Sequence, residues 1–512
     1  MSQRLFFFGI IALFFTVALL PVLVMVADTL ISAKGVDFSA YAMLLHSKSL
    51  QQSFVNSLWL SVSVAAMTTL FGVMLGVVLE KTTLPFKMGL IFLFVIPLLI
   101  PPYILALGWF EFVGREGVLG ELLFGFWGTF WVLFSVYLPI PILLTILFLK
   151  QIDPRLEEAG LLITGWGGVL KGITLPLIRP ALFLSFILVF ILSFGEYSVA
   201  NFLRYPVFPL ESFTAFSAFY DFKTATVLAM PMLLVAFIVL MAEQFFVHKH
   251  FSGFTTSYRT NRIFLGKYRY IVLLAVVVVV MVVVCMPLFT LFVKAAHWQT
   301  LLEAWQKGYE PMLRTLFYGA AGASLLVIFG FLSGYIIQQK LFGWWRLYDA
   351  SILFMFTLSP IVIGIALILF WNRPATNFIY NTPLIILFGY LGKYLALTTK
   401  ITQTRLSQIP PSMIEAAQMA GADWLEILRF ILVPLSKKTL LIAWMIGFIF
   451  SLRENTITML VYPPGLEPLP VYIITQMANG KPEVVAALSV IMIGMTLLPL
   501  AILLFVRKGE HD

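Results

Sequence analysis

Long apolar stretches alternate with short polar segments along all 512 residues of the chain. A membrane hydrocarbon core about 30 Å thick is crossed by roughly 20 apolar residues in a helix, because only a helix satisfies its own backbone polar groups in lipid. Twelve stretches are long enough for a crossing, and they lie near residues 5–27, 55–79, 89–113, 122–149, 181–203, 226–247, 268–293, 315–338, 348–372, 383–399, 438–461 and 484–506. The pattern predicts an all-α polytopic membrane protein, in agreement with a composition that is 61% hydrophobic and 11% charged.

The lysines and arginines predict the orientation of these spans. Short cytoplasmic loops carry an excess of both residues, and most of the 33 fall where a cytoplasmic N-terminus would place cytoplasmic segments. An even number of crossings then returns the C-terminus to the cytoplasm. The first apolar stretch is too long for the core of a signal peptide, so we expect it to be retained as a span. The net charge of +9 is explained by this topology signal and predicts no nucleic-acid partner.

Landmark residues recur about 258 positions apart, which indicates an internal repeat. The matched pairs are Gly72 and Gly330, Gly76 and Gly334, Pro102 and Pro360, Pro176 and Pro434, and Glu196 and Glu454. Residues 1–247 and 268–512 would then be two six-helix halves, with a cytoplasmic linker at 248–267. Six crossings leave both halves in the same orientation, so we expect a parallel repeat with a pseudo-twofold axis along the membrane normal.

Two cytoplasmic segments, 151–177 and 408–435, occupy matching positions after the fourth span of each half. Each opens with proline, carries acidic residues near its start, bends near a glycine and reaches a second proline where the next span begins. Acidic residues at a helix start complement the helix dipole. The alternative interpretation is that each segment is a solvated linker helix, but two such helices at symmetric positions would be an unusual coincidence. A duplicated helix pair is instead suited to a partner with twofold symmetry.

These segments resemble the coupling-helix signature of ABC importer permeases, in which E-A-A, three residues, glycine and nine residues precede I-x-L-P. The second segment matches closely, with Val433 in place of the leucine, whereas the first has Gly160 at the third motif position and Thr164 where the glycine is expected. The resemblance assigns ATPase coupling to Glu157, Glu158, Ala159, Gly165, Pro176, Glu415, Ala416, Ala417, Gly421 and Pro434. It implies two fused type I ABC importer permease halves, similar to the ferric-iron branch; thiamine and 2-aminoethylphosphonate importers have similar layouts.

The resemblance also implies the partners. Two copies of a cytosolic ABC ATPase subunit would each grip one helix pair, and a periplasmic or lipid-anchored binding protein would deliver the substrate. We expect ATP on the partner subunits and no cofactor on this chain, because the glycine–lysine pairs at Lys393 and Lys481 lack the remaining residues of a phosphate loop. The expected location is the bacterial inner membrane, with both termini in the cytoplasm. The chain would be a transport subunit and not an enzyme.

Ionisable residues inside apolar stretches are candidates for the translocation pathway, because burying them in a membrane is costly. Glu196 and Glu454 occupy the same repeat position and could form an acidic constriction that suits a cation. Arg453 could neutralise one carboxylate, and both carboxylates could instead lie at outer helix ends. Lys393 and Glu111 are weaker candidates, since snorkelling explains either one.

Carboxylate oxygens are hard ligands and the chain has one cysteine, so ferric iron is the preferred cargo and thiolate metal binding is disfavoured. Whether this chain itself binds metal is left open. Thiamine is also cationic and remains an alternative, as does an aminoethylphosphonate if Arg453 dominates the path. A secondary transporter, which needs no ATPase, is a second class of function. The sequence shows no convergent catalytic constellation.

Overall fold

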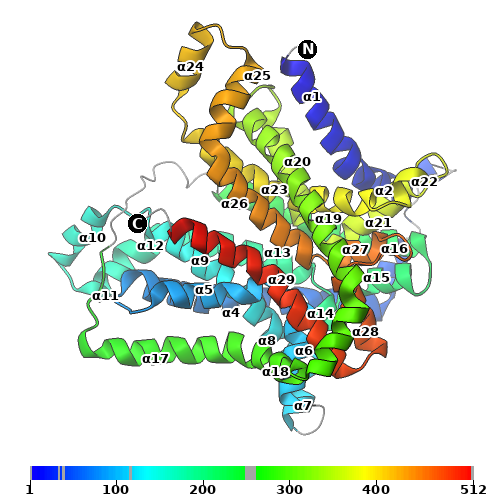
Figure 1. The fold of residues 1–512 in the computed structure, drawn as a ribbon, viewed down its shortest axis with the longest axis horizontal. Helices are drawn as coiled ribbons and strands as arrows, with labels where there is room; N and C mark the ends of the chain where they lie inside the picture. Colours follow the sequence, from blue (N-terminus) through cyan, green and yellow to red (C-terminus); the bar gives the residue numbers. More distant parts are fainter. Residues whose placement is uncertain are drawn as a thin grey trace. The chain divides into compact units, whose positions relative to one another are not determined.

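A computed structural model describes residues 3–32, 35–36, 38, 41–114, 118–247 and 261–508, and most of them are helical (Figure 1). The predicted all-α polytopic class is confirmed. The chain forms two compact units: unit 1 comprises Met1–Ala42, Ser212–Leu233 and Trp298–Asp512, and unit 2 comprises Met43–Glu211 and Leu234–His297. Residues 248–260 of the predicted linker lie outside the described residues. The boundaries 1–247, 248–267 and 268–512 stay a prediction.

The described residues contain nine continuous helical stretches that could cross a membrane and three bent helix pairs, which together match the twelve predicted spans. The continuous stretches are Gln3–Leu30, Lys48–Lys81, Phe126–Leu149, Phe222–Phe245, Gly266–Ala295, Trp298–Gln338, Leu384–Ser407, Trp424–Arg453 and Pro482–Ala501. The bent pairs are Lys87–Leu99 with Pro102–Val113, Trp166–Leu177 with Arg179–Phe194, and Trp345–Thr357 with Pro360–Trp371.

Unit 1 contains the N-terminal helices and most of the second sequence half. Its elements are α1 (Gln3–Phe14), η1 (Phe15–Leu19), α2 (Leu20–Leu30), β1 (Ile31–Ser32), β2 (Gly35–Val36), α19 (Trp298–Gln338), α20 (Trp345–Thr357), α21 (Pro360–Trp371), α22 (Asn377–Tyr380), α23 (Leu384–Ser407), α24 (Pro411–Met419), α25 (Trp424–Glu426), η6 (Ile427–Leu432), α26 (Val433–Arg453), α27 (Thr456–Val461), α28 (Leu469–Asn479) and α29 (Pro482–Lys508). The two-residue strands pair antiparallel, with Ile31 opposite Val36. Within this unit, α24 and α25 lie at the opposite end of α26 from α28 (Figure 1).

Unit 2 contains most of the first sequence half. Its helices are α4 (Lys48–Lys81), α5 (Lys87–Leu99), α6 (Pro102–Val113), α7 (Val118–Leu123), α8 (Phe126–Tyr137), α9 (Pro139–Leu149), α10 (Pro154–Leu161), α11 (Trp166–Val169), η3 (Leu170–Thr174), α12 (Leu175–Leu177), α13 (Arg179–Phe194), α14 (Ser198–Phe202), η4 (Gly266–Tyr268), α17 (Arg269–Val280), η5 (Met281–Cys285) and α18 (Met286–Ala295). Three helices include residues of both units: α3 (Ala42–His46), α15 (Phe208–Ser217) and α16 (Phe222–Val247).

The third span of each half is broken at a proline. The chain bends by 102° between α5 and α6 and by 107° between α20 and α21. Pro102 and Pro360 each stand at the first position of the second helix, where their missing N–H costs nothing. The residue before a proline is driven toward extended backbone, and both Pro101 and Ser359 have ψ near 135°. The apolar pattern alone predicted one span in each place and gave no sign of the bends.

The two G-x-x-x-G pairs allow close helix packing, as their spacing suggests. A Cβ built at Gly72 would lie 2.3 Å from Pro141 Cγ, and one at Gly76 would lie 2.8 Å from Thr145 Cβ. These contacts join α4 to α9 in unit 2. In unit 1 the matched pair, on α19, faces the threonines of α23 in the same way. The repeat therefore extends from sequence landmarks to the packing of the second span on the fourth.

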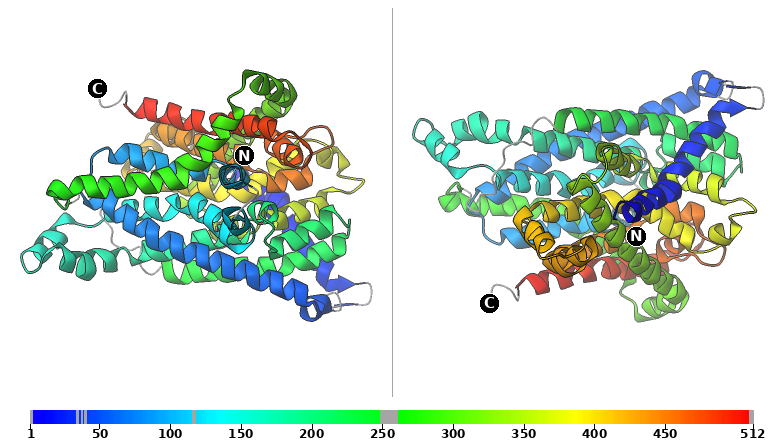
Figure 2. Two further views of the ribbon diagram at one scale, coloured as in Figure 1. Left: turned by 90° about the horizontal axis from the view of Figure 1, so that it is seen from below. Right: turned by 90° about the horizontal axis from the view of Figure 1, so that it is seen from above.

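The first span of each sequence half belongs to the unit that is built mainly from the other half. In unit 1, α1 and α2 form one rod (Figure 2), and Phe7 stacks on Tyr335 with 5.2 Å between ring centroids. In unit 2, α18 packs on α6, where a Cβ at Gly108 would lie 2.5 Å from the Pro287 carbonyl oxygen. The compact units therefore do not coincide with the sequence halves.

Candidate functional site

The first helix pair, α10 with α11 and η3, begins with the signals that the sequence suggested. Asp153 is the N-cap residue of α10, and its side chain accepts a hydrogen bond from the Arg155 N–H at 3.0 Å. Pro154 follows at the first helical position, where proline is favoured. These two residues fix where the helix starts.

Glu157 faces the interior of unit 2 and not the solvent. Its carboxylate is fully buried and accepts from Lys81 Nζ at 2.7 Å and from Thr174 Oγ1 at 2.9 Å. Lys81 is the last residue of α4, and Thr174 is the last residue of η3. The sequence placed Glu157 in the coupling motif but gave no sign of these two partners.

The neighbouring motif residues differ in exposure. Glu158 and Ala159 are exposed, as a surface meant for a partner requires. Gly160 is half-buried, and a Cβ at this position would lie 2.6 Å from Ile173 Cδ1. An alanine at this position would therefore have to displace the Ile173 side chain, which comes from the second helix of the same pair.

The second helix pair, α24 with α25 and η6, is more exposed. Glu415 and Ala416 are exposed, Ala417 is half-buried, and α24 has no fully buried residue. The pair is attached to α1 through Trp424, whose ring centroid lies 5.3 Å from that of Phe6. The two pairs therefore expose matching motif residues, but they are attached to the rest of their units by different contacts.

The bends of the two pairs use different chemistry. Gly421 has φ +86°, a left-handed conformation that favours glycine, and its N–H donates to the Gln418 carbonyl at 2.9 Å. Gly165 has φ −75° and ψ 175°, which other residues adopt freely. Thr164, at the position where the signature expects glycine, instead closes the turn by donating its N–H to the Gly160 carbonyl at 2.9 Å.

The final prolines of the motif follow a widened helical turn in each copy. Pro176 comes after η3 and Pro434 after η6, and both are π-helical stretches. A proline has no N–H to donate to the preceding turn, and such bulges accommodate that loss. The sequence predicted that the helix would end at each proline. Instead the second copy continues through Pro434 as one stretch to Arg453, while the first bends by 59° at Ile178, two residues beyond Pro176.

One large aliphatic side chain projects from the end of each pair at the same motif position. Leu162, four residues after Glu158, is 89% exposed, and Met419, four residues after Glu415, is 90% exposed. Ile163 beside Leu162 is 90% exposed as well. Each pair thus ends in an apolar tip that its own unit leaves uncovered. The sequence signature pointed to the preceding glutamates and overlooked these tips.

Glu196 does not lie within a continuous helix, as the apolar run predicted, but in the turn after α13. Its carboxylate accepts from the backbone N–H groups of Ser198 at 2.9 Å and Val199 at 3.1 Å, and from the Ser198 hydroxyl. These are N–H groups that a helix start leaves unpaired. Glu196 therefore caps α14.

Glu454 has the same role in the other half. It follows the end of α26 and accepts from the N–H groups of Ile457 at 2.8 Å and Thr458 at 2.9 Å at the start of α27. The neighbouring Arg453 is half-buried, with its guanidinium 5.4 Å from the centroid of the Phe450 ring. The repeat thus preserves a capping carboxylate in each unit.

Lys393 is buried in α23 and holds the bend between α20 and α21. Its Nζ donates to the carbonyl oxygens of Phe356 at 2.7 Å and Leu358 at 2.6 Å, and a cation at a helix C-terminus also complements the dipole. Glu111 in turn forms an ion pair with Lys294 at 2.5 Å. Both weaker pathway candidates thus have structural partners.

No family model matches the chain. The ferric transport system permease protein FbpB of Actinobacillus pleuropneumoniae is 26% identical over 486 residues, which cover 88% of this chain and 70% of that protein. The putative ferric transport system permease protein FbpB 1 of Haemophilus influenzae is 26% identical over 459 residues, covering 81% of this chain and 71% of that protein. The spermidine/putrescine transport system permease protein PotC of Haemophilus influenzae is 28% identical over 165 residues, covering 32% of this chain and 63% of that protein. The resemblance to ferric-iron permeases, which the paired motif predicted, is confirmed by these relatives.

Proposed function

We propose that this chain is the membrane permease of an ATP-driven, binding-protein-dependent importer, and that its cargo is ferric iron. The observation that carries the proposal is the helix pair in each unit, with the matched tips Leu162 and Met419. Burying a large aliphatic side chain is worth about 1.5–3 kcal/mol relative to leaving it in water. Two such tips at equivalent motif positions suit two copies of one partner with an apolar groove.

The partners follow from this assignment. Two cytosolic ABC ATPase subunits would bind the two helix pairs and would hold the ATP, so the chain itself is a transport subunit and not an enzyme. A binding protein would deliver cargo at the opposite face. The chain would lie in the bacterial inner membrane with both termini in the cytoplasm.

The names of the relatives and the preference of ferric ions for carboxylate oxygen support iron as cargo. We retain Glu196 and Glu454, with Arg453 beside the latter, as proposed pathway residues. Capping alone explains why both carboxylates are present, so the pathway role needs a separate test. Glutamine keeps one acceptor oxygen for the cap but removes the charge. Glu196→Gln and Glu454→Gln should therefore preserve the fold and lower iron uptake, and normal uptake in both would refute the pathway role.

Uptake of radiolabelled iron, thiamine and aminoethylphosphonate by cells with and without this chain tests the cargo. We expect only iron uptake to depend on the chain. Dependence of thiamine or aminoethylphosphonate uptake in its place would reassign the cargo and leave the importer intact. Dependence of none of the three would refute the cargo proposal altogether.

Co-purification of the ATPase tests the helix-pair contact. Leu162→Asp and Met419→Asp should each weaken retention of the ATPase subunit, and the double variant should abolish it. Phe219→Asp, at another exposed apolar position in the chain, is the control. Full retention in the double variant would refute the contact. Transport by the purified chain without any ATPase would establish a secondary transporter instead.

Reporter fusions test the orientation. Fusions at Lys171 and Arg429, in the two helix pairs, should report the cytoplasm, whereas fusions at Glu211 and Lys481 should report the outer side. A cytoplasmic signal at Glu211 would contradict six crossings per half.

A further inference from the structure

The ion pair between Lys81 and Glu157 is unusual because both side chains are almost completely buried, at 1% and 0% exposure. Removing two charges from water costs several kcal/mol per ion, so such a pair adds little stability compared with apolar packing. What it does supply is a fixed geometry. One carboxylate oxygen accepts from Lys81 and the other from Thr174, so neither oxygen is left without a donor.

These three residues come from three elements that meet at one point. Lys81 ends the membrane helix α4, Glu157 lies in the first turns of α10, and Thr174 ends η3. The carboxylate thus ties both helices of the first pair to one membrane helix. The same unit contains an apolar cluster that includes Val73 of α4, Leu149 of α9 and Ile178, the residue before α13.

The segment 261–265, which precedes η4, lies across the same elements. Asn261 Nδ2 donates to the Pro154 carbonyl at 2.8 Å. Ile263 donates its N–H to the Lys81 carbonyl at 2.6 Å, and its own carbonyl accepts from the Thr83 N–H at 3.2 Å. The segment is therefore bonded both to the start of α10 and to the end of α4.

The second helix pair is built differently at the equivalent positions. Gln339 replaces Lys81 and is exposed, Ile414 replaces Glu157 and is half-buried, and Leu432 replaces Thr174 and is buried. Two of the three equivalent positions in the second pair thus carry apolar residues in place of the polar cluster of the first. Helix α24 is also less buried than α10, since none of its residues is fully buried.

We propose that Lys81, Glu157 and Thr174, together with segment 261–265, form a latch that fixes the first helix pair rigidly to α4, whereas the second pair moves more freely. The latch rests on the proposed function, because the motion that it would transmit is that of a bound ATPase. Its members are positioning residues, and they act through α10 without contacting cargo or nucleotide. The two helix pairs of this pseudosymmetric chain would then have unequal mechanical roles.

Hydrogen exchange of the purified chain tests the latch without requiring transport. Glu157→Gln and Lys81→Met should speed exchange at the amides of 154–163 by about tenfold, as expected when a charge-assisted hydrogen bond is lost. Exchange at 411–420 should not change. Thr174→Val keeps the side-chain shape and should give a smaller change in the same direction, which provides a test if the charge variants fail to fold. Unchanged exchange at 154–163 in the folded variants would overturn the latch.

The assembled importer in liposomes supplies the functional readout. Glu157→Gln should raise the ATP hydrolysed per iron transported while the ATPase remains bound, and the charge-reversed pair Lys81→Glu with Glu157→Lys should restore part of the parental ratio. Lys87→Met removes a nearby ion pair with Glu80 and serves as the control. A parental ratio in Glu157→Gln would overturn the mechanical role of the latch. If the parent chain binds no ATPase, the proposed function fails, whereas the exchange result still decides the rigidity of the latch.

Discussion

Lys393→Met keeps the length of a buried side chain in α23 but removes the ammonium that holds the bend of the third span in unit 1. Two carbonyl oxygens, of Phe356 and Leu358, would lose their donor. A buried acceptor left unsatisfied costs about 1–3 kcal/mol, so the two together cost roughly 2–6 kcal/mol. Relief of the desolvation of a buried ammonium offsets part of this. We expect a net loss of about 3 kcal/mol in the free energy of unfolding.

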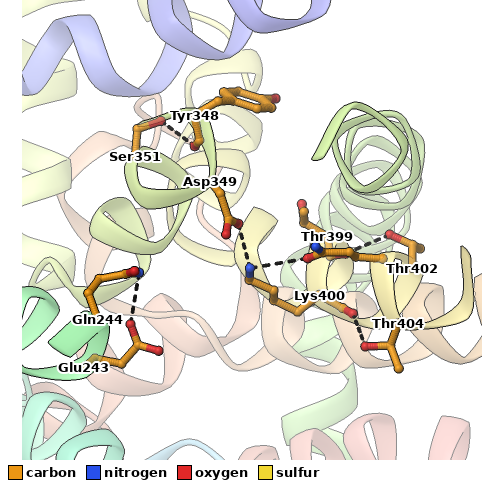
Figure 3. Close-up of polar contacts among 10 residues, drawn as sticks. Glu243, Gln244, Tyr348, Asp349, Ser351, Thr399, Lys400, Thr402 and Thr404 are labelled. Atoms are coloured by element: carbon orange, nitrogen blue, oxygen red, sulfur yellow. Dashed lines mark hydrogen bonds and ion pairs between the residues drawn. The ribbon is translucent and has the colours of Figure 1, made fainter. Parts of the chain in front are cut away.

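Denaturant titration of the purified chain in mixed micelles measures this loss. Lys400→Met is the matched control on the same helix, where Nζ lies 2.6 Å from Asp349 Oδ1 with the lysine 40% exposed (Figure 3). An ion pair at such a partly exposed site is worth about 0–1 kcal/mol. Lys393→Met should therefore be clearly less stable than Lys400→Met. Equal stabilities, or a gain in Lys393→Met, would refute the view that the ammonium holds the bend.

Glycine and capping substitutions give three further tests, each read as the change in unfolding free energy or as local hydrogen exchange. Gly421→Ala, at φ +86°, should destabilise the bend of the second helix pair by about 1 kcal/mol, whereas Gly165→Ala in the first pair should be close to neutral. Gly72→Ala forces a Cβ to within 2.3 Å of a proline ring and should cost about 1–3 kcal/mol, but Gly9→Ala, with open space around it, should not destabilise the chain. Asp423→Ala removes a capping box and should speed exchange at the start of α25, equivalent to about 1 kcal/mol. Equal effects within either glycine pair, or unchanged exchange in Asp423→Ala, would contradict the corresponding reasoning.

Much of this architecture could be predicted because membrane insertion leaves few choices. Apolar length specifies a helix in lipid, so the twelve spans could be located from the pattern. The glycines matched in the repeat lie where two helices pack closely, since at Gly72 and Gly330 the gap would not accommodate a side chain. The glutamates of the paired motif were found because both copies share their spacing.

Other features depend on contacts that sequence spacing does not reveal. Hydropathy is averaged over a window, so a single residue with extended backbone does not change it. The sharp bends at Pro102 and Pro360 were therefore missed. Lys81 was interpreted only as a topology signal, although its partner Glu157 lies 76 positions further along the chain. Glu196 was placed inside a helix because the residues on both sides of the break are equally apolar. None of these three errors could be avoided by counting apolar residues.

The membership of α1 and α2 in unit 1 has a consequence for biogenesis. The rod is synthesised roughly 300 residues before its partner Tyr335, an interval of about 15–60 s at 5–20 residues per second. During that interval the nascent rod must wait in the bilayer with lipid or an insertase in place of its native neighbours. If the chain were cut in the linker, the N-terminal fragment would carry α1 and α2, which belong to the unit built mainly from the C-terminal fragment. The two fragments would therefore fold completely only when both are made together.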